Sequence, residues 1–276
     1  MAQTNRIWFK KAFNIKKSIL PQIGWRLSLV TIYFVIITYL NGKLYNLDIP
    51  ILSSLVPNVI LGLLLVFRTN TAYERFWEGR KLWGDINNYV RSIVMMINTL
   101  NIEKKDKIKL VDRLVNFVFL TKDKLRDEVQ TDLLIEEQKT KIHPNLWELN
   151  LLNQELDLIH DKSLMKVEIY MLFNQKINIL TNALGGCERI MSTPIPLGYS
   201  IHIKQLILLY CFTLPFQFVG QIGWFTPVVC FLIAFALMGI EQIGLEIENP
   251  FGKDTYDIEL DKICVNIKNN AYDLLI

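Results

Sequence analysis

Residues Ile49–Trp83 read IPILSSLVPNVILGLLLVFRTNTAYERFWEGRKLW, and the organisation of the whole chain can be worked out from them. The first half, Ile49–Phe67, is uncharged and about long enough to cross the hydrocarbon core of a bilayer. From Arg68 onward charged residues appear, yet large side chains keep helical spacing at Tyr73, Phe76, Trp77 and Trp83. We therefore predict one helix, or two helices stacked end to end, that begins in lipid and continues into the cytosol.

The composition is that of a protein with lipid-embedded and water-exposed parts. Of the 276 residues, 51% are hydrophobic and 21% are charged, and the mean hydropathy is +0.25. The formal net charge of +3 is too small to indicate a nucleic-acid partner. The sequence contains no GxSxG, HExxH, GxxxxGKS/T or GxGxxG motif, so we expect no enzymatic activity. The four cysteines show no CxxC spacing, and we expect them to be small buried side chains.

Apolar runs and basic residues divide the chain into five parts. In order, we predict a basic amphipathic segment on the membrane surface (1–26), transmembrane helices 1 and 2 (27–67), a cytosolic helical domain (68–204), transmembrane helices 3 and 4 (205–241) and a cytosolic C-terminal segment (242–276). The GQIGW segment at Gly220–Trp224 supplies the turn between helices 3 and 4. Basic residues flank the outer ends of helices 1 and 2, which places both termini in the cytoplasm. No strand pattern of any length occurs, so the predicted fold class is all-α.

Four spans are too few for one chain to enclose a transport pathway, so a pore would need several copies around an axis. In the second span Leu52, Val56 and Ile60 recur at four-residue steps and share one helix face. In a symmetric ring each position would form an apolar collar that gates by dewetting. From the spacing alone, packing of this face against a neighbouring helix explains the pattern at least as well.

Four segments carry a family resemblance. They are FRTNTAYERFWEGRKLWG at Phe67–Gly84, GGCERI at Gly185–Ile190, TPIPLGYS at Thr193–Ser200 and ENPFGKD at Glu248–Asp254. In their order and spacing they resemble segments of the bacterial bestrophins, which form pentameric ion channels with a single central pore.

The resemblance assigns roles to particular residues. It implies that Leu52, Val56 and Ile60 form the narrow neck of the pore and that Ile169 forms a second, cytosolic constriction. A place in the core of the cytosolic helices explains Ile169 equally well. Animal bestrophins have phenylalanines in the neck, whose ring edges can favour anions, whereas this chain has aliphatic residues there. The choice between anions and cations therefore stays open at this point.

The resemblance also implies a calcium clasp, because Asn249, Asp254 and Asp257 match three of its positions and oxygen ligands at such spacing can bind calcium. However, Lys253 lies beside them and would repel a divalent cation. We favour a structural turn, with calcium binding as the alternative, and we predict no other cofactor.

Together these observations predict a homopentameric channel in the bacterial inner membrane that passively conducts small monovalent ions, with anions such as chloride favoured. Its partners would be other copies of the same chain, the lipid bilayer and the permeating ions. Two alternatives stay open: a monovalent cation channel, and a non-conducting membrane scaffold or signalling protein.

Overall fold

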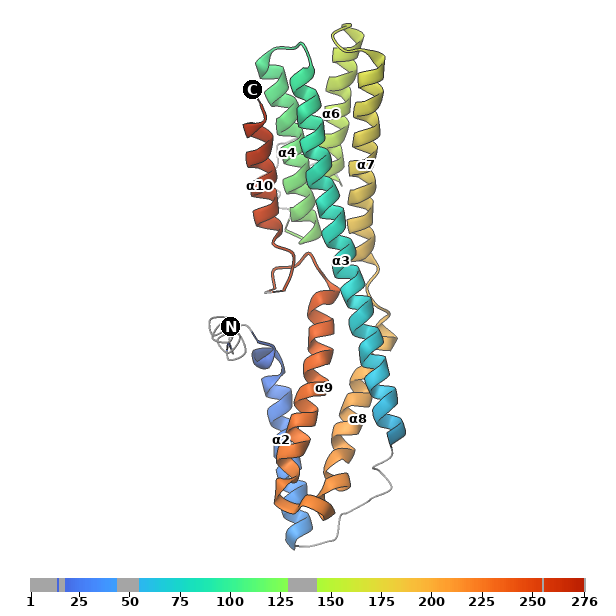
Figure 1. Cartoon of the computed structure of the whole chain (residues 1–276), viewed down its shortest axis with the longest axis vertical. Coiled ribbons are helices and arrows are strands. Elements are labelled where there is room, and N and C mark those ends of the chain that lie inside the picture. Colours follow the sequence, from blue (N-terminus) through green and yellow to red (C-terminus); the bar gives the residue numbers. More distant parts are fainter. Residues whose placement is uncertain (1–13, 15–17, 44–54, 129–142, 255, 276) are drawn as a thin grey trace, which may run out of the picture. The chain divides into compact units, whose positions relative to one another are not determined.

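The computed structural model describes residues 14, 18–43, 55–128, 143–254 and 256–275, and its regular elements are helices (Figure 1). In chain order they are α2 (Leu20–Lys43), α3 (Leu55–Thr99), α4 (Lys104–Leu125), α6 (Pro144–Asp161), α7 (Val167–Ser192), α8 (Leu197–Ile222), the 3-10 turn η4 (Gly223–Phe225), α9 (Thr226–Glu248) and α10 (Leu260–Asp273). Within the described ranges there is no strand, and the predicted all-α class is confirmed.

The helix predicted to leave the lipid is α3, and it is a single continuous helix of 45 residues. Of the two alternatives, one helix is therefore correct. The polar residues after Arg68 do not end the helix, because apolar residues continue at three- and four-residue steps and give this part a new face to bury. Residues 49–54, where the predicted helix begins, lie outside the described part of the chain.

The turn predicted at Gly220–Trp224 is also present. Gly223 has a φ of +50°, a left-handed conformation that glycine adopts without strain, and it begins the short η4 segment between α8 and α9. Both helices are longer than the predicted spans, since α8 begins at Leu197 and α9 ends at Glu248. Within the described residues, two stretches are long and apolar enough to cross a membrane, Leu20–Lys43 and the α8–α9 stretch Leu197–Glu248.

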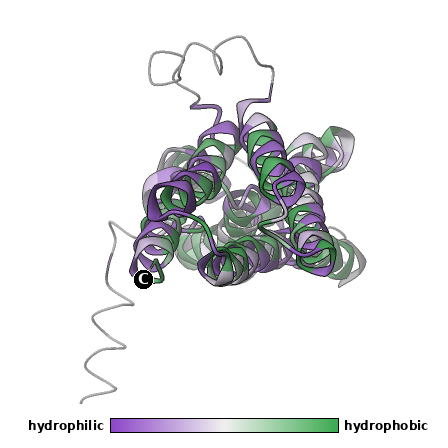
Figure 2. Ribbon diagram, turned by 90° about the horizontal axis from the view of Figure 1, so that it is seen from above, coloured by the Kyte–Doolittle hydropathy of each residue, from purple (hydrophilic) through white to green (hydrophobic). Residues whose placement is uncertain are grey.

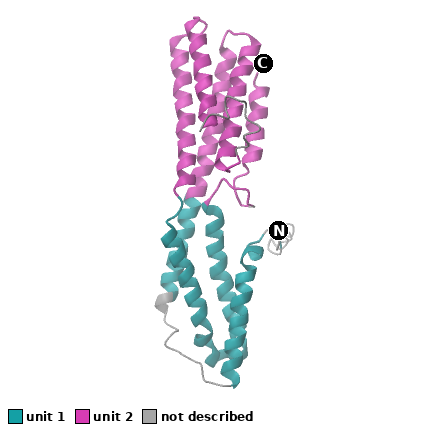
Figure 3. Ribbon diagram, turned by 180° about the vertical axis from the view of Figure 1, so that it is seen from behind, with its two compact units in different colours: residues 1–74, 194–248 teal, residues 75–193, 249–276 magenta. Residues whose placement is uncertain are grey.

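The chain divides into two compact units (Figure 3). Unit 1 comprises residues 1–74 and 194–248, and in it α2, α8 and α9 pack against one another. Its apolar cluster joins these three helices to the first part of α3. The fully buried members include Ile23, Phe34, Leu65, Ile203, Leu214, Cys230 and Ala234.

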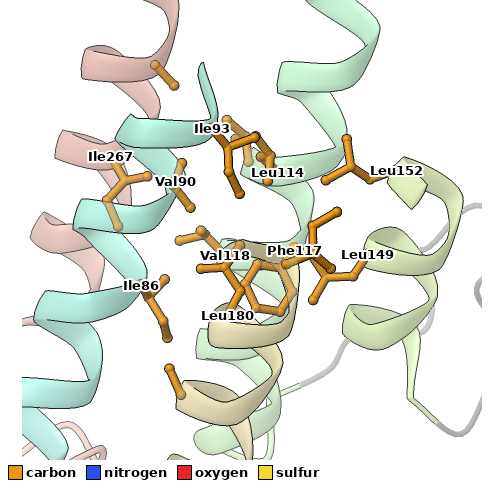
Figure 4. Close-up of a cluster of buried hydrophobic side chains, with 14 of the residues drawn as sticks. Ile86, Val90, Ile93, Leu114, Phe117, Val118, Leu149, Leu152, Leu180 and Ile267 are labelled. Atoms are coloured by element: carbon orange, nitrogen blue, oxygen red, sulfur yellow. The ribbon is translucent and has the colours of Figure 1, made fainter. Parts of the chain in front are cut away.

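Unit 2 comprises residues 75–193 and 249–276. Its helices carry apolar and polar residues side by side, as the end-on view in Figure 2 shows, and they bury their apolar faces in one core. Figure 4 shows Val90 of α3 and Leu114 and Phe117 of α4 in this core, with Leu149 of α6 nearby. The C-terminal helix α10 belongs to the same core through Cys264 and Ile267.

Two close approaches fix how the helices of unit 2 pack. A Cβ atom added to Gly186 in α7 would lie 2.8 Å from both Cδ atoms of Leu82 in α3. A Cβ atom added to Gly79 would lie 3.0 Å from Cε1 of Phe251. Glycine therefore brings α7 and the loop that carries Phe251 close to α3. All four cysteines are buried, as predicted.

Candidate functional site

The two faces of α3 within unit 1 differ sharply. One face is buried against the other helices of unit 1, through Leu61, Leu65, Arg68 and Ala72. The opposite side is apolar and exposed, through Val59, Ile60, Leu63, Val66 and Phe67. Among the described residues of a single copy, this apolar face of α3 has no packing partner, and soluble monomers rarely expose such a face.

The predicted neck residues belong to this part of the chain. Ile60 is 52% exposed and lies on the uncovered side of α3. Val56 lies one turn earlier in the same helix, and Leu52 lies outside the described residues. Among the described residues of one copy, the Ile60 side chain is only partly packed, and its place in the neck of a pore stays a prediction.

Behind this face lies a buried charge cluster that the sequence reasoning missed. Arg68 in α3 is fully buried, and its Nη1 donates to Oε1 of Glu241 in α9 at 2.7 Å. Its Nη2 lies 3.7 Å from Glu248, whose other oxygen accepts the Ile195 backbone N–H at 3.0 Å. A buried charge is tolerated when it is paired and hydrogen-bonded, so these contacts tie α3 to α9 and to the start of α8.

Two more cations approach the same carboxylate. Arg26 of α2 lies 3.8 Å from Glu241 and also donates to Gln242 at 2.7 Å, and Lys204 of α8 lies 4.0 Å from Glu241. The sequence does contain a signal for the cluster. Arg68 and Glu241 are the first charged residues after two apolar runs, at the positions where the predicted spans end. An ionisable residue at such a boundary can be paired inside a bundle.

The predicted cytosolic constriction, Ile169, lies in the first turn of α7. Its side chain is partly buried and packs against the core of unit 2. Val167, Met171 and Leu172 in the same turns are exposed. Packing therefore supports a core role for Ile169, and a role as a constriction stays a prediction.

The residues of the predicted calcium clasp form a turn whose side-chain oxygens accept hydrogen bonds from backbone N–H groups of the same turn. Oδ2 of Asp257 accepts the backbone N–H of Asp254 at 2.7 Å, and Oδ1 of Asn249 accepts that of Phe251 at 3.4 Å. The Ile258 N–H closes the loop on the Pro250 carbonyl at 2.9 Å. Among the described residues, no three His, Cys, Asp or Glu side chains gather as a metal site would need. These hydrogen bonds support the structural turn, and calcium binding by the same residues stays the alternative.

The loop leads into an ion cluster at the start of α10. Asp261 accepts from Lys122 in the last turn of α4 at 3.0 Å and from Arg126, directly after α4, at 2.6 Å. These two hydrogen bonds lower the pKa of Asp261 to about 2. Arg126 also donates to the Phe251 carbonyl at 3.2 Å, so one cation anchors both the loop and α10.

Comparison with known proteins shows the family. Residues 1–273 match the model of the bacterial and fungal bestrophin proteins, and the chain belongs to this family. A voltage-dependent anion channel-forming protein of Nostoc sp. is 42% identical, over 99% of this chain and 94% of that protein. A protein of the same description from Synechocystis sp. is 40% identical over the same shares.

Solved structures agree in fold. The crystal structure of a bacterial bestrophin homologue from Klebsiella pneumoniae has a TM-score of 0.83 and 29% identity, covering 92% of this chain and 98% of that one. A structure described as a membrane protein has a TM-score of 0.84 and 28% identity over the same shares. The resemblance seen in the four sequence segments is thus confirmed, and with it the assignment to a family of membrane proteins.

Proposed function

We propose that this chain forms a passive channel for small anions such as chloride, built as a ring of five identical copies. The observation that carries the proposal is the exposed apolar side of α3 at Ile60, Leu63 and Phe67. Related proteins covering almost the whole chain are named anion channel-forming proteins. A helix with one face anchored to its own bundle and the other uncovered is suited to lining a shared pore.

In this proposal the collar at Ile60, together with those at Val56 and Leu52, is the gate. An ion passing an aliphatic ring loses water and gains no polar ligand, so the ring conducts only when it widens. The buried pair of Arg68 and Glu241 would hold α3 in place about two turns beyond Ile60. Conduction would be passive, since nothing in the proposed gate couples ion movement to an energy source.

We propose further that the protein lies in the bacterial inner membrane with both termini and unit 2 in the cytoplasm. Arg26, Arg68 and Lys204 cluster at one end of the apolar helices, which the positive-inside rule places on the cytoplasmic side. Alkaline phosphatase and fluorescent protein fusions at the C-terminus test this orientation. Fluorescence without phosphatase activity is expected, and the opposite result would reject it.

The test of conduction is a single-channel recording in planar bilayers. Ile60→Ala shortens the side chains that form the collar and so widens the ring. It should raise the conducting fraction or the current several-fold, because a wider ring dewets less readily. Leu209→Ala is the matched control, since Leu209 is an equally exposed apolar residue on α8, and it should leave the current unchanged.

Two further measurements complete the test. The reversal potential in a chloride gradient should follow chloride, and a potential that follows the cation would replace the anion proposal with a cation channel. The mass of the complex in detergent and in nanodiscs should equal five chains. A monomer in both would reject the ring, and the absence of current in every variant would favour a scaffold.

A further inference from the structure

Unit 1 contains a groove whose two ends differ in chemistry. It is lined by α2, α8 and α9 and encloses about 360 Å³, within the range of small-molecule sites. The side chains of Arg26, Lys204 and Glu241 lie on its lining, and the remaining lining is apolar apart from the Tyr33 ring with its hydroxyl. The groove therefore combines a compact charged region with a long apolar wall.

The order of residues along the two walls places the cations at one end. On α2 the lining residues run from Arg26 to Tyr33, and on α8 they run from Lys204 to Phe212. At 1.5 Å per residue each wall is about 10–12 Å long, with its cation at the beginning. At the far end, the Tyr33 hydroxyl donates to the Phe212 carbonyl at 3.0 Å, and the two rings meet edge to face with centroids 5.0 Å apart.

The charged groups at the near end differ in exposure: Glu241 and Glu246, which accepts from Gln242, are buried, whereas Arg26 and Lys204 are partly exposed. Arg68, Arg26 and Lys204 all approach Glu241, at 2.7, 3.8 and 4.0 Å, and Arg68 is shared with Glu248. These contacts gather three cations around two carboxylates. Arg68 is fully buried, and its Nη1 donates to Glu241. The side chains of Arg26 and Lys204 are 44% and 45% exposed. Arg26 and Lys204 are therefore the cations of this cluster that a ligand in the groove can reach.

We propose that this groove binds one anionic phospholipid per chain, with the phosphate between Arg26 and Lys204 and an acyl chain along the apolar wall. Guanidinium and ammonium groups are the usual phosphate ligands, and the charge-assisted hydrogen bonds they form are strong. The apolar wall of Leu29, Leu208 and Phe212 favours a ligand with an acyl chain over a purely soluble anion. The inference does not depend on ion conduction, and it would hold equally for a non-conducting protein.

The experiment is a lipid titration of the purified full chain, followed by native mass spectrometry. Phosphatidylglycerol and phosphatidylcholine with identical acyl chains are added separately, so that only the headgroup charge differs. We expect one tightly retained phosphatidylglycerol per chain and about tenfold weaker retention of phosphatidylcholine. Equal retention of the two lipids would overturn the proposal.

Three variants locate the site. Lys204→Gln should lower phosphatidylglycerol retention to the level of phosphatidylcholine. Lys43→Gln removes a cation from the other end of α2 and should change nothing, which controls for overall charge. Leu208→Trp should weaken binding of both lipids by filling the groove while leaving every charge in place. Circular dichroism and the oligomer mass check that each variant is folded.

Two other outcomes would also reject the proposal. If glycerol phosphate competes as well as the lipid does, the apolar wall contributes nothing and the site is an ordinary anion site. If a cysteine at Leu208 crosslinks efficiently to a second copy and no lipid is retained, the groove is covered by another copy of the chain.

Discussion

Both units of this protein have a buried apolar cluster, but they differ in what they expose and in where they hold a buried arginine. Unit 2 encloses large apolar residues such as Trp83, Phe117 and Phe173, while ion pairs such as Arg189–Glu78 lie on its exposed surface. Unit 1 encloses the Arg68–Glu241 pair and exposes many apolar residues, including Val66 and Leu209. One continuous helix, α3, contributes to both patterns.

In the proposed arrangement, with unit 1 in lipid and unit 2 in water, the difference follows from the solvent around each unit. In water, apolar surface is driven inward, so unit 2 has an apolar core and a charged exterior. In lipid, apolar surface can face outward at no cost, and helices associate through packing and polar contacts in the interior. The apolar exterior and the buried ion pair of unit 1 therefore agree with the membership of this chain in a membrane-protein family. We expect the buried charges of unit 1 to matter for stability as the apolar core does in unit 2.

The largest expected effect comes from removing the buried carboxylate of unit 1. Glu241→Ala leaves Arg68 buried without its 2.7 Å partner and should destabilise the protein by about 3–5 kcal/mol. Thermal unfolding in detergent should show a midpoint lower by roughly 10 °C. The control is Glu78→Ala, which breaks the exposed pair with Arg189 in unit 2 and should cost less than about 1 kcal/mol.

A double variant separates pairing from packing in the same cluster. Replacing both partners, with Arg68→Leu and Glu241→Leu, should recover much of the lost stability, because the fully buried guanidinium is removed together with the carboxylate that it contacts at 2.7 Å. If the double variant is as unstable as Glu241→Ala, the cluster matters through its shape and not through its charge balance. Equal losses for Glu241→Ala and Glu78→Ala would remove the contrast between the units.

An intermediate effect is expected from two neighbouring glycines in α7. Gly186→Ala places a methyl group 2.8 Å from the Cδ atoms of Leu82; the cost of moving that side chain exceeds the gain in helix propensity, so we expect a net destabilisation of about 1 kcal/mol. Gly185→Ala meets no atom within 4 Å and should stabilise the helix by about 0.5–1 kcal/mol. Unfolding midpoints that move in the same direction for both variants would contradict the tight packing of α7 on α3.

The smallest expected effect concerns the ion cluster of unit 2. The pKa of Asp261 is lowered from 3.8 to about 2, so its contribution to stability is complete above pH 4 and is lost as the pH falls towards 2. The side chain is 63% exposed, so the contribution is that of a surface pair, about 0.2–1 kcal/mol. The wild type should be more stable than Asp261→Asn at pH 5, and the two unfolding midpoints should converge near pH 2. A constant difference across this range would rule out the titration of Asp261 as its cause.

Much of the fold could be predicted because it depends on local patterns. The helical course of α3 past Arg68 follows from the spacing of Tyr73, Phe76 and Trp77, and the turn before α9 follows from the glycines around Gly223. The cluster of Arg68 with Glu241 could not be predicted in the same way. Its members are far apart in sequence, and nothing local says which charged residue at the end of an apolar run will find a partner.

The candidate site was predicted less completely than the fold. The spacing predicts that Leu52, Val56 and Ile60 share one helix face; the structure leaves the Ile60 side chain half exposed, and its place in a pore stays a prediction. Ile169 could not be distinguished from a core residue by spacing, because the apolar stripe that packs a helix and one that lines a passage have the same period. The turn at Asn249–Asp257 shows the same limit, since a carboxylate that could bind calcium can equally hold a backbone N–H.

The sequence by itself determined the class of protein, the helices and the family, because composition, spacing and short motifs are written along the chain. Only the tertiary structure decided which charges are buried together, which side of α3 stays uncovered and where a groove with a cationic end forms. The physical reason is that these features depend on the distances between side chains of different helices, and those distances exist only after the helices have packed.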